Sequence, residues 1–170
     1  MFTIAFTAVF LFDEAEFFTF GHQIHVYDKR SGQEVGSVHQ KLFCFLPEFE
    51  NEPHAYVKLW KHHAAQKQAD RIGEVAKGRG ESWLPLYGGK ISSEWMFPKI
   101  LEVLEEAPHV YEAADRFIEA GDWIVWMLTG HEARSASVSG FKSFWGETGC
   151  RLSEDFLTAL HPGLAGIIGT

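Results

Sequence analysis

The feature that most constrains the fold is the apolar run at residues 2–12, which mixes Phe, Ile, Val and Thr without polar alternation. A strand that is apolar along its whole length has to be covered on both faces, as strands are in the parallel sheet of an α/β protein. Asp13 and Glu14 end the run too early for a membrane span, and no basic residue precedes it. The run therefore predicts a central, buried strand; a cryptic signal peptide is the alternative.

Length and composition predict one globular domain with a proper core. The chain has 170 residues, of which 46% are hydrophobic and 22% charged. Its formal net charge is -8, and no cluster of Lys or Arg is long enough to follow a phosphate backbone. The two cysteines, Cys44 and Cys150, form neither a metal motif nor a disulfide framework. We therefore expect neither nucleic acid nor membrane as a partner, and a cytoplasmic location.

Turn and capping residues divide the rest of the chain into short elements. β-Formers on both sides of DKRSG predict a hairpin, and Pro53 predicts the start of a long helix. The expected elements after the first strand are a hairpin around 28–32, a helix over 54–77, a helix capped by Ser92 or Ser93 and ended near Pro108, a short helix at 110–114, a strand at 116–120, and a capped helix at 153–160.

Two further stretches bear on function. GDWIVWMLTG, residues 121–130, predicts a helix with Asp122 as N-cap and Gly130 as C-cap. Because its interior is apolar on every side, the helix is expected to be buried, with its two tryptophans packed in the core. SASVSGFKSFW, residues 135–145, is interpreted as a strand or loop of small residues.

Among candidate chemical groups, Lys142 is the most informative. SGFKSFW surrounds its ammonium with apolar and small residues, so the charge needs an acceptor if it is buried; snorkelling to the surface is the alternative. His62 and His63 are adjacent on a predicted helix, where neighbours point about 100° apart and do not suit one metal ion. No common phosphate-binding loop or G-x-S-x-G nucleophile motif occurs.

Three strings resemble a known family. NEPHAYVKLWKHHAAQ, YGGKISSEWMFPK and FIEAGDWIVWMLTG, in this order and at these separations, resemble the FGGY carbohydrate kinases, and within them the bacterial enzymes that phosphorylate L-ribulose in arabinose catabolism. The resemblance covers roughly residues 44–165. It implies a ribonuclease H-like (actin-like ATPase) α/β fold, a mixed sheet flanked by helices, in which a first domain holds the sugar and a second holds ATP and Mg²⁺.

On this resemblance the chain consists of a divergent strand and hairpin at 1–43, then the later part of the sugar-binding domain at 44–170, without the ATP-binding domain. The resemblance implies that Lys142 donates hydrogen bonds to sugar hydroxyls, and it points to Ala8, in FTA, as a substrate contact. Trp60 falls where related kinases place an aromatic ring against the sugar. Glu94 can accept a hydrogen bond from a sugar hydroxyl; a role in capping the helix or interacting with its dipole is the alternative.

In an intact relative, ATP would phosphorylate the 5-hydroxyl of L-ribulose while an aspartate of the second domain takes the proton. The present sequence has neither that aspartate nor the Asp-x-Gly-Thr phosphate-binding hairpin of the family. We therefore expect a fragment that is inactive alone, binds no ATP or Mg²⁺, and takes L-ribulose or a related ketopentose. A non-catalytic interaction module, homo-oligomers included, and a sugar-binding sensor are the alternatives.

Overall fold

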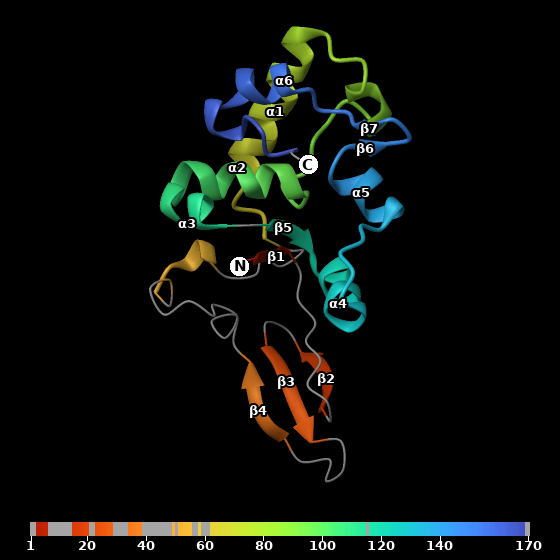
Figure 1. Cartoon of the computed structure of the whole chain (residues 1–170). Helices are drawn as coiled ribbons and strands as arrows, with labels where there is room; N and C mark the ends of the chain where they lie inside the picture. Colours follow the sequence, from red (N-terminus) through yellow and green to blue (C-terminus); the bar gives the residue numbers. More distant parts are fainter. Residues whose placement is uncertain are drawn as a thin grey trace. The chain divides into compact units, whose positions relative to one another are not determined.

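The computed structural model describes residues 3–6, 15–20, 23–28, 34–38, 49, 51–55, 58, 62–114 and 116–168. Its contacts divide the chain into two compact units (Figure 1). The first unit comprises Met1–Leu59 and Glu112–Ala133, and the second comprises Trp60–Tyr111 and Arg134–Thr170. Within the described ranges, no helix combines the length and the apolar character that crossing a bilayer requires.

The first unit contains a parallel strand pair. Strand β1, Thr3–Phe6, pairs with β5, Arg116–Glu119, in parallel, so that Ile4 lies opposite Phe117. Helix α4, Ala120–Thr129, follows β5 without a loop and contacts both strands (Figure 1). The predicted strands are therefore confirmed at Thr3–Phe6 and Arg116–Glu119. The central, buried position expected of the first strand stays a prediction. A parallel pair needs a long crossover connection, which is the arrangement expected of an α/β protein.

A separate antiparallel sheet belongs to the same unit. It consists of β2, Ala15–Phe20, β3, Gln23–Asp28, and β4, Glu34–Val38, in that order. The β3–β4 pair confirms the predicted hairpin, with a break in register between Val26 and Tyr27. Strand β2 was not predicted, because AEFFTF shows no alternation of polar and apolar residues that would mark a half-buried strand.

Two details of α4 differ from the prediction. Its N-cap is Glu119, the last residue of β5, and Asp122 lies buried in the first helical turn. Gly130 does cap the C-terminus, with φ of 72°. The helix is not buried on every side, because Val125 is 46% exposed. An apolar sequence thus did not enforce complete burial.

The second unit is built on three helices. Helix α1, Gln66–Arg79, packs against both α2, Met96–Glu106, and α6, Glu154–Leu160 (Figure 1). Buried side chains recur on α1 at helical spacing and meet apolar residues of the other two helices. The core includes Ala69, Ile72, Ala76, Ile100, Leu101, Val103, Phe156 and Leu157.

The long helix expected over 54–77 is wrong in its first half. Residues Pro53–Ala55 form a short 3-10 turn, η3, and α1 begins only at Gln66. The position before α1 is Ala65, which has no side chain that could cap the helix. The C-terminus follows the expected glycine rule, because Gly80 adopts φ of 70° and the Glu81 N–H donates to the Ala76 carbonyl at 3.0 Å.

Serines also cap differently from the prediction. Neither Ser92 nor Ser93 caps α2, whose N-cap is Trp95; the Ser92 hydroxyl instead accepts the Glu94 N–H at 3.2 Å. Residues expected to form a strand or loop form α5, Ala136–Lys142, because Ser135 caps it by accepting the Val138 N–H. The short helix is confirmed as α3, Pro108–Ala113. The remaining elements are η4, Leu84–Tyr87, β6, Trp145–Gly146, β7, Gly149–Cys150, and η5, Pro162–Leu164.

The capped final helix is confirmed, and its cap can be tested. The Ser153 hydroxyl accepts the Phe156 N–H at 3.1 Å. Ser153→Ala removes this acceptor, so we expect the free energy of unfolding to fall by about 1 kcal/mol. Urea denaturation followed by circular dichroism measures it. Thr158→Ala, an exposed position on the same helix, is the matched control; an equal loss in both variants would contradict the capping role.

Candidate functional site

Lys142 lies at the C-terminal end of α5 and is buried, with 8% of its surface exposed. The sequence left burial and snorkelling to the surface as alternatives, and the structure shows a residue that is buried as a whole. A cation in the last turn of a helix is favoured by the partial negative charge of the helix terminus. The backbone of α5 near Lys142 is bound to another segment, because the Tyr87 hydroxyl donates a hydrogen bond to the Gly140 carbonyl at 2.8 Å.

Tyr87 is suited to that anchoring role. Burial raises the pKa of its hydroxyl above the ordinary value, although nearby Arg151 acts in the opposite direction. The phenol therefore keeps its proton throughout the neutral range and remains a hydrogen-bond donor. The C-terminal turn of α5 is held in place by this bond independently of pH in that range.

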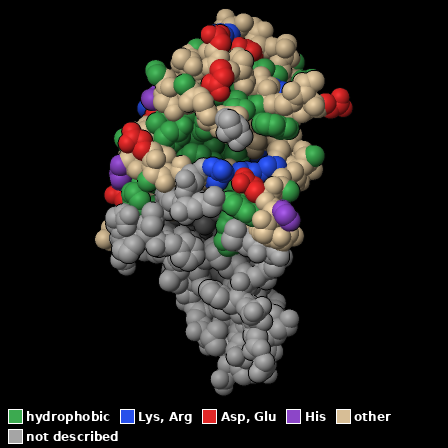
Figure 2. Space-filling model, in the orientation of Figure 1, with side chains coloured by type: hydrophobic (Ala, Val, Ile, Leu, Met, Phe, Trp, Pro, Cys, Tyr) green, Lys and Arg blue, Asp and Glu red, His purple; other side chains and the backbone are tan. Residues whose placement is uncertain are grey.

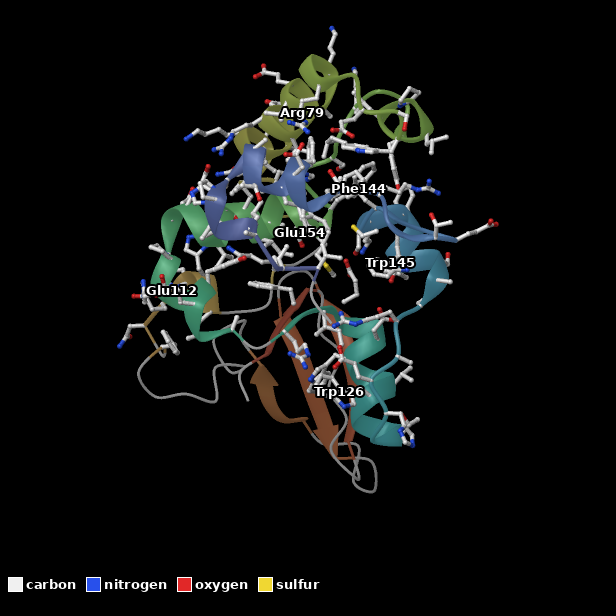
Figure 3. The ribbon with its side chains drawn as sticks, turned by 45° about the horizontal axis from the view of Figure 1, so that its top comes forward. Arg79, Glu112, Trp126, Phe144, Trp145 and Glu154 are labelled. Carbon is white, nitrogen blue, oxygen red and sulfur yellow. The ribbon has the colours of Figure 1, made fainter. Side chains whose placement is uncertain are left out.

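An aromatic cluster centred on Phe144 joins the end of α5 to the start of α2. The Phe144 ring is completely buried and makes edge-to-face contacts with Trp83, Tyr87, Trp95 and Phe97, at centroid distances of 5.2, 4.8, 5.5 and 5.9 Å. Such pairs add about 0.5–1.5 kcal/mol each beyond the area that they bury. Figure 3 shows Phe144 toward the interior of this unit. The cluster makes the region rigid.

Glu94 precedes α2 and belongs to the same neighbourhood. Its side chain is 25% exposed, and a carboxylate oxygen lies 3.8 Å from Nε2 of His63. The next residue, Trp95, contacts the ring of Phe141 at 5.5 Å. Because Phe141 is the neighbour of Lys142 in α5, the structure brings together the two chain segments that carry Lys142 and Glu94. The other two predicted site residues, Ala8 and Trp60, lie outside the described residues.

Adjacent histidines reach two different carboxylates, which the sequence did not reveal. Nε2 of His62 lies 2.8 and 3.0 Å from the two carboxylate oxygens of Glu102, a residue of α2 that is only 1% exposed. Lys99, one turn earlier in α2, is also buried. The pairing joins positions 40 apart in the sequence, and no spacing rule for adjacent histidines would have found it.

The chemistry available at this site is hydrogen bonding. An ammonium has three N–H donors and a carboxylate only accepts, so Lys142 and Glu94 offer complementary partners to hydroxyl groups. Within the described ranges, no set of three His, Cys, Asp or Glu side chains is placed to hold a metal ion. His131 is exposed, and Glu132 pairs with Arg116 at 3.4 Å, so that segment forms a surface.

Comparison with known proteins identifies relatives. The chain is 50% identical over 125 residues to the ribulokinase of Bacillus licheniformis, covering 74% of this chain and 23% of the relative. It is similar to part of the ribulokinases. The ribulokinase of Mycolicibacterium smegmatis is 54% identical over 125 residues, covering 74% and 22% of the two chains. That of Staphylococcus aureus strain Newman is 47% identical over 124 residues, covering 72% and 22%. No protein-family model matches.

The match covers only a part of each relative. The chain spans less than a quarter of the length of these ribulokinases. The similarity agrees with the resemblance that the three sequence strings showed to bacterial enzymes that phosphorylate L-ribulose. It does not reach most of the relatives' chain.

The two histidines form a matched pair for a stability test. His62→Ala removes the imidazole nitrogen that lies 2.8 and 3.0 Å from the oxygens of the buried Glu102 carboxylate, so we expect the free energy of unfolding to fall by roughly 1–3 kcal/mol. His63→Ala should change it by less than about 0.5 kcal/mol, because His63 is 64% exposed and 3.8 Å from its carboxylate. Urea denaturation of both variants compares them. A larger loss for His63→Ala would contradict this assignment.

Proposed function

We propose that this chain provides part of the ketopentose-binding surface of a ribulokinase, the type of enzyme that phosphorylates L-ribulose with ATP. The observation that carries the proposal is the identity of about 50% to ribulokinases over three quarters of the chain. Identity at that level over 125 residues argues for shared ancestry of the matched segment. The substrate class follows from the relatives' name, and the residues follow from the family resemblance.

Lys142 is the proposed sugar ligand. Lys142 is 8% exposed and lies at a helix end that contacts of Tyr87 and the Phe144 cluster support. An ordered, partly desolvated ammonium is well suited to donate to sugar hydroxyls, because little entropy is lost when the hydrogen bonds form. Glu94, on the adjoining segment, would accept a hydrogen bond from a sugar hydroxyl. Ala8 and Trp60 stay proposed contacts on the family resemblance.

The proposed fold is the first domain of a ribonuclease H-like sugar kinase. The parallel β1–β5 pair with α4 directly after β5 is compatible with such an α/β arrangement. In that fold, residues 44–170 would form the later part of the sugar-binding domain. ATP and Mg²⁺ would be held mainly by a second domain.

Phosphoryl transfer itself would require groups that these 170 residues do not supply. It depends on aligning the attacking hydroxyl, the γ-phosphoryl group and Mg²⁺, with a base for the hydroxyl proton. The sequence contains neither the phosphate-binding hairpin nor the second-domain aspartate of the family. We therefore propose that the 170-residue chain by itself binds the sugar without turning it over.

The test measures sugar binding and turnover separately. We expect L-ribulose to bind the purified chain in isothermal titration calorimetry and to raise its melting temperature. Lys142→Met keeps the apolar stem but removes the ammonium, so we expect Kd to rise roughly ten- to hundredfold, since hydrogen bonds to charged groups contribute about 1.5–3 kcal/mol. With ATP and Mg²⁺ present, no phosphorylated sugar should form.

Lys90→Met, at an exposed position of the same unit, is the matched control and should bind L-ribulose normally. D-Glucose should give no heat. Two results would refute the proposal: absence of L-ribulose binding by the wild-type chain, or equal affinity in the Lys142→Met variant. Clear turnover by the purified chain would overturn only the statement that these residues cannot transfer phosphate alone.

A further inference from the structure

The Glu94 carboxylate is largely covered by protein, yet its hydrogen-bonding capacity is not used within the described part of the chain. Its side chain is 25% exposed, so it can still be reached from the surface. A carboxylate accepts several hydrogen bonds through its two oxygens. Among the residues that the structure describes, no donor lies within hydrogen-bonding distance of these oxygens, and Nε2 of His63 is 3.8 Å away. The carboxylate is therefore available to a donor from outside the chain.

His63 places a second polar group beside that carboxylate. Its side chain is 64% exposed, and histidine side chains reach the surface on the face shown in Figure 2. The neighbouring His62 behaves differently, because its Nε2 lies 2.8 and 3.0 Å from the oxygens of Glu102. The two adjacent histidines thus reach different partners, and the imidazole of His63 is free to bind a further group beside Glu94.

The backbones that carry the two side chains are held by hydrogen bonds. The N–H of Gln66, at the start of α1, donates to the His63 carbonyl at 3.2 Å. The Glu94 N–H donates to the Ser92 hydroxyl at 3.2 Å, and the next residue, Trp95, is buried. Contacts between α1 and α2 join the two segments. A ligand bound by both side chains would therefore order little additional backbone.

The separation of the two side chains suits one hydroxyl oxygen. An oxygen about 2.8 Å from each of two atoms that are 3.8 Å apart sees them at an angle of about 85°, which a hydroxyl accommodates. A hydroxyl has one donor and two acceptor positions, so it can donate to the carboxylate and accept from the imidazole N–H at the same time. A keto oxygen cannot donate. The pair is therefore selective for an alcohol group.

We propose that His63 and Glu94 together hold one hydroxyl group of the ketopentose, which donates to the Glu94 carboxylate and accepts from the His63 N–H. This inference rests on the proposed function, in which Glu94 accepts a hydrogen bond from the sugar. It deepens that function by adding His63 as a second ligand of the same hydroxyl. The two side chains bind and orient the sugar without transferring a proton.

The test is a double-mutant cycle on the full chain, with L-ribulose binding measured by calorimetry. His63→Leu removes the N–H donor, and we expect Kd to rise roughly tenfold. Glu94→Met removes the charged acceptor, and we expect a rise of roughly ten- to hundredfold. Because both side chains bind one hydroxyl, the double variant should bind within about threefold of Glu94→Met alone. Losses that multiply in the double variant would overturn the shared hydroxyl.

Conservative replacements separate hydrogen bonding from a structural role. His63→Gln places an amide N–H near the position of Nε2 and should bind L-ribulose within about threefold of wild type. His63→Asn, whose amide is shorter, should bind as weakly as His63→Leu. His131→Leu, at another exposed histidine, is the matched control and should keep the wild-type Kd. Equal losses in His63→Gln and His63→Leu would contradict the inference.

Monodeoxy analogues of L-ribulose identify the hydroxyl group. The analogue that lacks it should bind wild type and His63→Leu with the same Kd, whereas the other analogues should bind His63→Leu more weakly than wild type. A loss with every analogue would overturn the inference. If Lys142→Met weakens L-ribulose binding and His63→Leu does not, this inference alone fails. If wild type binds no L-ribulose, the proposed function fails with it.

Discussion

The packing of one ring, Phe144, determines how the proposed sugar-binding segments are arranged. Four aromatic neighbours from residues 83–97 surround it. Because these contacts reach α2 and the turn before it, they hold the end of α5 near Glu94. They also support the left-handed backbone of Phe144, with φ of 56°, which separates its buried ring from the exposed ring of Trp145. The cluster thus supports the chain segment that follows Lys142.

Hydrogen bonds and ion pairs connect the helices of the second unit in addition to the apolar core. The Arg71 guanidinium binds both Glu105 of α2 and the Leu160 carbonyl at the end of α6, so one side chain of α1 connects three helices. His62 performs a similar role for Glu102, whose carboxylate would be costly to bury alone. The Arg79 guanidinium likewise binds Asp155 of α6. The pairs of Arg71 and Glu102 are at least partly buried and help to determine which helix faces meet, whereas Asp155 is 83% exposed and contributes little.

Much of the local structure followed from the sequence where a single physical signal dominated. Glycine at Gly80 and Gly130 ended helices as expected, and Ser153 capped one. The prediction was wrong after Pro53, where a helix start was expected: Pro53–Ala55 form only a 3-10 turn, and α1 begins at Gln66. At Ser135 the capping hydroxyl outweighed the low helix propensity of the small residues that follow.

The candidate site was only partly predictable, because its contacts join residues that are far apart in the sequence. Lys142 stood out because a lone charge among apolar residues is conspicuous in a sequence. The contacts that position Lys142 cannot be recognised in the sequence, since Tyr87 and Gly140 are 53 residues apart. Which of several aromatic residues stays outside, as Trp145 does, depends on the turn at Phe144, and a left-handed phenylalanine has no sequence signature.

The interleaving of the two units has a consequence for the order in which the chain can fold. Helices α1 and α2 emerge from the ribosome within one stretch and can pair at once. The contact between α1 and α6 forms later, because residues 112–133 belong to the first unit and are synthesised in between. The α1–α2 pair therefore lacks its contact with α6 until residues 154–160 have been made, and that interval is when chaperones or aggregation would compete for the apolar surface.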